Sequence, residues 1–175
     1  MSTGTVGDAF PDLAPAPTFA FRGREYAVRP ASPATVVLFE NEVARQMRAN
    51  LEELRGTMSP ADYAGEQAAM REQLYVAKAH QFGGAAHAAK LNDPTGTSLL
   101  FWSYVAASDA SFTPQAAFEF VQEQPERFVE LFAAVTPDFF RLSGKRRGIN
   151  PAAVEATVKA FESQLAAMPR PTPAP

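Results

Sequence analysis

The densest run of apolar positions in the chain lies between residues 97 and 135. Apolar residues recur there at helical spacing around Trp102, again around Phe120 and again around Phe132. Two prolines, each placed where a helix can begin, divide the run into three segments. The polar positions between the apolar groups are mainly acidic, so we expect this stretch to pack rather than to catalyse. The pattern predicts three helices, at about 96–108, 113–124 and 125–135.

An alternation of apolar and polar residues predicts a β-hairpin at about residues 18–29. Gly23-Arg24 is predicted as its two-residue turn. This turn places Arg22 opposite Glu25 as an opposite-charge pair and gathers the aromatic residues on one face. Because a lone hairpin is only marginally stable in water, we expect this one to pack against the helices.

A capping residue followed by proline recurs six times along the chain. Ser, Thr, Asp or Asn accepts a hydrogen bond from a free backbone N–H at a helix start, and proline fits the first helical position. The six dipeptides are Ser32-Pro33, Ser59-Pro60, Asp93-Pro94, Thr113-Pro114, Thr136-Pro137 and Asn150-Pro151. The fifth of them is expected to open another turn or short helix. Together with the apolar stripes, the others predict further helices at about 33–54, 60–81, 85–91 and 151–168.

These elements predict a mostly α-helical, multi-helix single domain with a short N-terminal β-hairpin and flexible, Pro-rich ends. Three basic residues between two glycines, before the last helix, indicate a solvated hinge. The expected organisation is a flexible arm at 1–17, a hairpin plus helical domain at 18–142, a basic hinge loop at 143–150, a C-terminal helix at 151–168 and a disordered tail at 169–175.

The composition is that of an ordinary soluble globular protein. Of the 175 residues, 46% are hydrophobic and 20% are charged, and the formal net charge is −3. This charge provides no large basic field for nucleic acid, and the apolar runs are too short to cross a bilayer. Because the chain has no cysteine, disulfides and thiolate chemistry are excluded, and an intracellular location is mildly favoured.

The titratable residues predict neither a catalytic site nor a metal site. His80 and His87 are the only histidines, a glycine pair separates them, and no HExxH pattern occurs. Lys145-Arg146-Arg147 is interpreted as a solvated loop rather than as a contact to nucleic acid. The acidic residues of 119–130 are interpreted as a solvated face rather than as a surface for a basic partner. We therefore predict no enzyme activity and no cofactor.

Aromatic abundance is the unusual feature of the sequence. The chain has 14 phenylalanines, and neighbours such as Phe118 and Phe120 do not fit on one narrow helical stripe. Either these rings fill the core from two sides, or some of them line an apolar groove that accepts an amphipathic helix of a partner. The residues predicted to contact such a partner are Trp102, Phe118, Phe120, Phe128 and Phe132.

The order of these segments carries a family resemblance. The hairpin reads FAFRGREYAVRP, and a later apolar helix, a short turn and a capped helix read LLFWSYVAASDASFTPQAAFEFVQEQPERFVELF. Over about residues 18–142 this order resembles the tail assembly chaperones of long-tailed bacteriophages. An F-x-F-x-G-x-x-Y-x-V/L-R-P opening is common in that family.

The resemblance implies a non-enzymatic protein that works in the host cytoplasm. Such a protein binds the long apolar tape-measure protein, keeps it soluble and helps to recruit the tail-tube protein. A longer frameshifted form is usual in the family, and this chain would be the unshifted one. The alternative is a structural virion protein of the phage tail or of the head–tail connector. A homo-oligomer is a further expected partner arrangement.

Overall fold

The computed structural model describes residues 16–167, so the predicted tail at 169–175 and nearly all of the predicted arm at 1–17 lie outside the described residues. Within that range the fold class is confirmed, since one antiparallel hairpin precedes a series of helices. No helix in residues 16–167 is both long enough and apolar enough to cross a membrane. The elements are β1 (Thr18–Phe21), β2 (Arg24–Ala27), α1 (Pro33–Leu54), α2 (Pro60–Arg71), the π-helix η1 (Glu72–Val76), α3 (Ala85–Leu91), α4 (Pro94–Ala106), α5 (Pro114–Glu123), α6 (Pro125–Arg147) and α7 (Pro151–Ala167).

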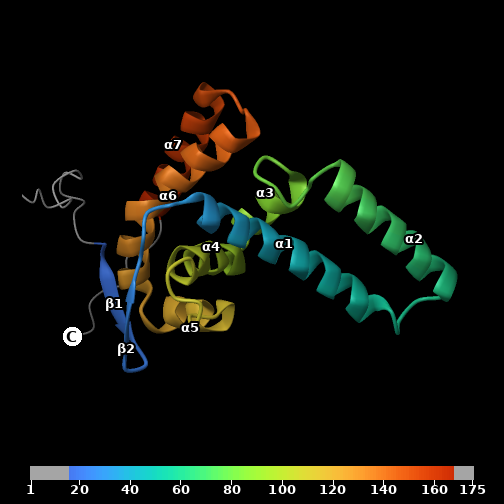
Figure 1. Ribbon diagram of the computed structural model, residues 1–175, viewed down its shortest axis with the longest axis horizontal. Coiled ribbons are helices and arrows are strands. Elements are labelled where there is room, and N and C mark those ends of the chain that lie inside the picture. Colours follow the sequence, from blue (N-terminus) through green and yellow to red (C-terminus); the bar gives the residue numbers. More distant parts are fainter. Residues whose placement is uncertain (1–15, 168–175) are drawn as a thin grey trace, which may run out of the picture.

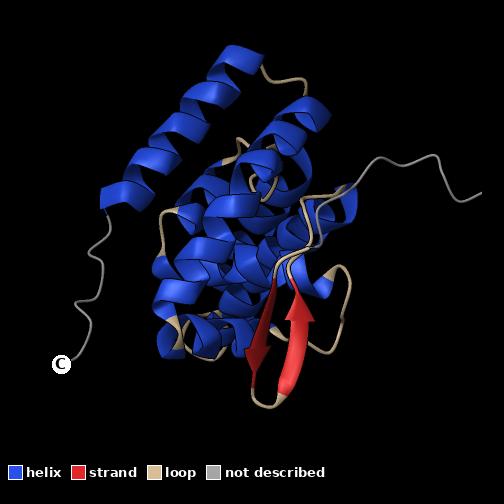
Figure 2. Ribbon diagram, turned by 90° about the vertical axis from the view of Figure 1, so that its left-hand side faces the viewer, coloured by secondary structure: helices blue, strands red, loops and turns tan. Residues whose placement is uncertain are grey.

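The helices form a compact body from which one arm projects (Figure 1). Helix α1 starts in the body, beside α4 and α6, and its C-terminal half leaves the body toward α2. Helix α7 folds back along α6 from the C-terminal end of that helix (Figure 2). The hairpin lies near the N-terminal end of α6, where Arg127 donates a hydrogen bond to the carbonyl of Thr18. The hairpin and the body share one core, whereas α2 has no buried residue.

Most of the cap–proline dipeptides start helices as predicted. Ser32 forms a capping box with Thr35, and Ser59, Asp93 and Thr113 each accept a backbone N–H at a helix start. The side chain of Asn150 likewise accepts the N–H of residue 152 at 2.9 Å. Because a cap and its proline act within one helical turn, these starts follow from local sequence alone.

The core is built largely of aromatic rings that join the hairpin to the helices. The ring of Phe19 lies 4.4 Å from that of Phe120 and 5.5 Å from that of Phe101, measured between centroids. Phe101 and Phe120 stack at 5.3 Å with an interplanar angle of 11°. The hairpin therefore covers α4 and α5, which meets the expectation that it does not stand alone.

The hairpin turn was predicted one residue too late, so the predicted pairing of the strands is wrong by two residues. Arg22 and Gly23 form the turn, and both have positive φ, 50° and 74°. A two-residue turn of this kind needs φ > 0 at both positions, and glycine meets that need at the second one. As a result Ala20 pairs with Glu25, and Arg22 turns away to form an ion pair with Glu119 on α5 at 2.8 Å.

The second long helix ends earlier than predicted. Regular α-helix stops at Arg71, and η1 carries the chain only as far as Val76, whereas the pattern predicted a helix to Gln81. Lys78 then takes a positive φ of 49° and turns the chain back toward the body. Phe82 becomes buried there, and its N–H donates to the carboxylate of Glu40 on α1 at 3.2 Å. Burial of this segment thus outweighs the local helical pattern.

Helix α6 continues through Pro137, so the helix end predicted at Val135 is wrong. An interior proline removes a backbone hydrogen bond and costs about 3 kcal/mol or more. Here the residues on both sides of the proline are buried, with Val135 at 4% exposure and Phe139 at 0%. Packing of this face against the core offsets the cost of the proline.

The basic hinge loop predicted at 143–150 is wrong for the same reason. Residues 143–147 are helical, Ser143 and Gly144 are buried, and Gly144 lies against Val154 on α7. The helix ends one residue later at Gly148, whose φ of 65° gives a left-handed cap. The two glycines therefore serve a helix contact and a helix end rather than a flexible linker.

Candidate partner-binding groove

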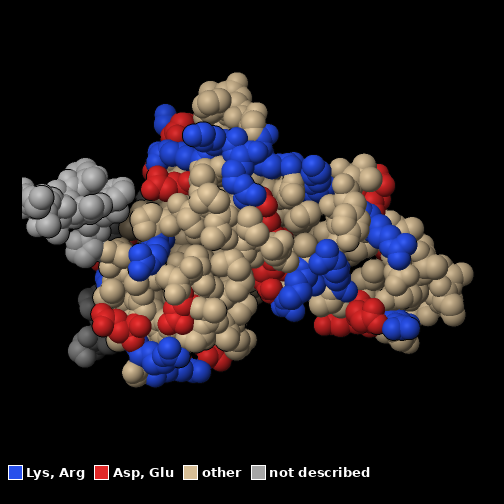
Figure 3. All heavy atoms as spheres, in the orientation of Figure 1, with Lys and Arg blue, Asp and Glu red and all other residues tan. Residues whose placement is uncertain are grey.

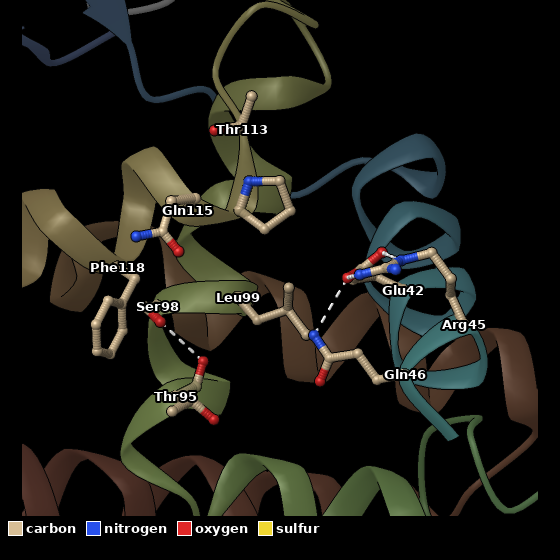
Figure 4. Close-up of a pocket in the computed structure, with 10 residues that line it drawn as sticks. Glu42, Arg45, Gln46, Thr95, Ser98, Leu99, Thr113, Gln115 and Phe118 are labelled. Carbon is tan, nitrogen blue, oxygen red and sulfur yellow. Dashed lines mark hydrogen bonds and ion pairs between the residues drawn. The ribbon is translucent and has the colours of Figure 1, made fainter. Parts of the chain in front are cut away.

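An open groove of about 520 Å³ lies between α1, α4 and the N-terminal part of α5 (Figure 4). The starts of two helices contribute to it, because Thr95 lies in the first turn of α4 and Thr113 is the N-cap of α5. We call it the α1/α4/α5 groove. Its lining residues are Glu42, Arg45 and Gln46 from α1, Thr95, Ser98 and Leu99 from α4, and Thr113, Pro114, Gln115 and Phe118 from α5.

The α1 wall of the groove carries a charge pair that neutralises itself. Arg45 Nε and Nη2 donate to the two oxygens of the Glu42 carboxylate at 2.6 and 2.5 Å. Gln46 Nε2 adds a third donor at 3.1 Å. Glu42 is only 7% exposed, and the hydrogen bond and charge of this carboxylate raise the pKa of the Arg45 guanidinium. An occupant of the groove would therefore meet a fixed and electrically balanced wall.

The opposite walls combine an apolar floor with hydroxyl groups that already have partners. Leu99 is 3% exposed, and Phe118 is half-buried. The Ser98 hydroxyl donates to the carbonyl of Thr95 at 2.8 Å, and the Thr113 oxygen accepts the N–H of residue 116 at 3.1 Å. The groove offers apolar contact and amide groups, with no activated nucleophile.

The five aromatic residues predicted to contact a partner do not form one surface. Phe120, Phe128 and Phe132 lie in the core, with exposures of 0%, 4% and 1%. Trp102 is half-buried, and its indole Nε1 donates to the carbonyl of Phe112 at 2.8 Å. Phe118 alone among the five lines the α1/α4/α5 groove. The core-filling interpretation therefore describes three of them.

Sequence reasoning missed two other surface features. The pair Glu42 and Arg45 is spaced for an ordinary helical ion pair, and no local signal shows that α4 and α5 make one wall of a groove beside it. Tyr75 and Val76 are 69% and 67% exposed at the end of η1, where the pattern predicted a continuing helix.

The histidines do not form a metal centre in the part of the chain that is described. No group of three or more His, Cys, Asp or Glu residues among residues 16–167 is arranged to hold an ion. His87 is 1% exposed between the rings of Phe39 and Phe82, at centroid distances of 5.1 and 5.3 Å. Burial, and in smaller part the charge of His80, lowers the pKa of His87 to about 4.

No protein-family model matches this sequence, and the chain has no significant match among curated proteins or solved structures. Its function is therefore inferred from the groove itself and from the surface around it.

Proposed function

We propose that this chain is a non-enzymatic phage tail assembly chaperone that holds an amphipathic helix of the tape-measure protein in the α1/α4/α5 groove. In this role it would act in the host cytoplasm and assist the addition of tail-tube subunits. The observation that carries the proposal is the position of Phe118. This is the predicted contact residue that lines an open groove, and it lies over an apolar floor that includes Leu99.

The chemistry of the groove favours a helix with one apolar stripe. The occupant's stripe would cover Phe118 and Leu99, and its flanking polar residues would face the amides of Gln46 and Gln115. Because Arg45 balances Glu42, the wall selects neither a strongly acidic nor a strongly basic occupant. A site with such undemanding electrostatics suits a long partner that offers many similar apolar segments.

Co-expression with the tape-measure protein is the direct test. We expect the chain to increase the soluble fraction of that partner, because a covered apolar helix aggregates less. Phe118→Ser should weaken the complex about tenfold or more, since it removes a central aromatic contact. Leu54→Ser, which alters an apolar residue that is 44% exposed at the end of α1, is the matched control and should leave the complex intact.

Two results would count against the proposal. Purified virions provide one readout, because a chaperone should be missing from mature particles. Stoichiometric incorporation there would favour a structural virion protein instead. An unchanged soluble fraction of the tape-measure protein, with the chain itself folded, would reject the chaperone role.

A further inference from the structure

Basic side chains gather at a second place, away from the α1/α4/α5 groove. They come from three elements: the last turn of α6, the middle of α1 and the segment after η1. We call them the basic band, which consists of Arg48, Lys78, Lys145, Arg146 and Arg147. Figure 3 shows Lys and Arg side chains extending from the region of α6 and α7 toward α3.

Side-chain contacts hold these elements together. Arg147 Nη1 donates to the side-chain oxygen of Gln81, and Arg146 Nη1 lies 3.9 Å from the Glu40 carboxylate. The same carboxylate accepts the N–H of Phe82, which fixes the segment after η1 against α1. Burial lowers the pKa of His80 in this segment. The charge of Glu40 raises this pKa, and the charges of Arg48 and Arg147 lower it, so both arginines lie near the segment. These contacts hold together the three elements that carry the band.

The band carries an excess of positive charge. Among the described residues, no carboxylate forms an ion pair with Arg48, Lys78, Lys145 or Arg147, and Glu40, the carboxylate near Arg146, is only 7% exposed. The helix dipole stabilises basic residues in the last turn of α6. Arg48, however, lies within α1, and Lys78 lies outside any helix. The dipole therefore accounts for only part of the band. In a chain with a net charge of −3, this concentration of unpaired cations needs another explanation.

We propose that the basic band binds an acidic segment of a partner protein. The surface around it favours a protein over nucleic acid. Tyr75 and Val76, at 69% and 67% exposure, precede Lys78 by three and two residues in the chain and are exposed apolar side chains that a protein partner can contact. Asp and Glu side chains also lie on either side of the band on the face shown in Figure 3. A long phosphate backbone would run into these carboxylates, whereas a short acidic segment fits between them.

The test compares two anionic probes on the full chain. Fluorescence anisotropy at low ionic strength would measure the binding of a poly-glutamate peptide of about eight residues and of single-stranded DNA of about eight nucleotides, which carry similar charge. We expect the peptide to bind more tightly than the DNA, with an affinity that falls as salt is added. The double variant Lys145→Gln/Arg147→Gln should weaken peptide binding about tenfold or more, because two charge-assisted contacts are removed.

Arg71→Gln provides the control, since Arg71 is exposed on α2, forms no ion pair among the described residues and removes one of the two charges that the double variant removes. It should leave peptide binding within about twofold of the original chain. Tighter binding of DNA than of peptide would overturn the proposal in favour of nucleic acid. No peptide binding, or an equal loss in Arg71→Gln and in the double variant, would overturn it as well. The groove variant Phe118→Ser should leave this binding unchanged, which separates failure here from failure of the chaperone role.

Discussion

Gly144 on α6 and Val154 on α7 touch where the two helices cross, with no space left for a side chain on the glycine. A Cβ built at Gly144 would overlap Val154 Cγ2. Both residues are buried, and Gly144 lies in the last part of α6, which the sequence indicated as a hinge. The crossing of α6 and α7 therefore depends on the absence of a side chain at Gly144, which lets the two helices approach closely. It does not depend on backbone flexibility.

Gly144→Ala should lower the free energy of unfolding by about 1–3 kcal/mol, because the added methyl group overpacks the crossing. Urea unfolding would measure the change. Gly65→Ala on α2 is the matched control: its Cβ would meet nothing within 4 Å, and alanine should stabilise that exposed helix by about 0.5–1 kcal/mol. An increase in the free energy of unfolding for Gly144→Ala would contradict the contact with Val154.

Phe118 and Phe120 should differ sharply in what they contribute to stability. Phe120→Ala should cost about 3–5 kcal/mol, because the ring is fully buried against Phe19 and Phe101. Phe118→Ala should cost about 1 kcal/mol or less, because this half-buried ring faces the groove. Denaturant unfolding of both variants checks the difference, and similar losses would place Phe118 in the core instead.

The sequence predicted helix starts well because their causes are local. Ser32 and Thr113, for example, cap helices by contacts within three residues of their own positions. The positions at which the helices end could not be predicted from local sequence in this way. Pro137 is a strong local stop signal, yet α6 passes through it because residues distant in sequence bury its neighbours.

The candidate site shows the same division. Aromatic abundance indicated surplus apolar surface, but it did not distinguish Phe118 from Phe120, two positions away on the same helix. That distinction comes from the hairpin, which lies over Phe120 and not over the groove. The hairpin register itself depends on the positive φ of Arg22, and no residue preference marks arginine for that conformation.

Pro137→Ala should stabilise the chain. An alanine restores the backbone N–H that proline lacks, and that N–H can bond to the carbonyl four residues earlier in α6. We expect a gain of about 1 kcal/mol, smaller than the full cost of an interior proline because the unfolded chain also becomes more flexible.

Thermal or denaturant unfolding would measure this gain against Pro125→Ala. Pro125 occupies the start of α6, where the missing N–H has no partner in any case, so its replacement should change stability by less than about 0.5 kcal/mol. A destabilised Pro137→Ala would mean that the ring of this half-buried proline contributes more to packing than its missing hydrogen bond costs.

His87 should make the fold sensitive to acid. The buried imidazole, whose Nε2 has no hydrogen-bond partner among the described residues, has a pKa of about 4, whereas an unperturbed histidine has a pKa of 6.5. Between these values the unfolded chain binds the proton and the folded chain does not, so stability falls as pH falls from 6.5 toward 4. The stability that is lost by protonation of His87 is fully present above pH 6.5. The total loss is about 3 kcal/mol once the pH has fallen to about 4.

Urea unfolding at several pH values from 7 to 4.5 would measure this slope. His87→Leu fills a similar volume beside Phe39 and Phe82 and has no proton to bind, so it should flatten the dependence on pH in this window. His80→Gln is the control and should keep the part of the slope that belongs to His87. If His87→Leu retains the pH dependence of the original chain, another group, and not this buried imidazole, is responsible for the loss of stability in acid.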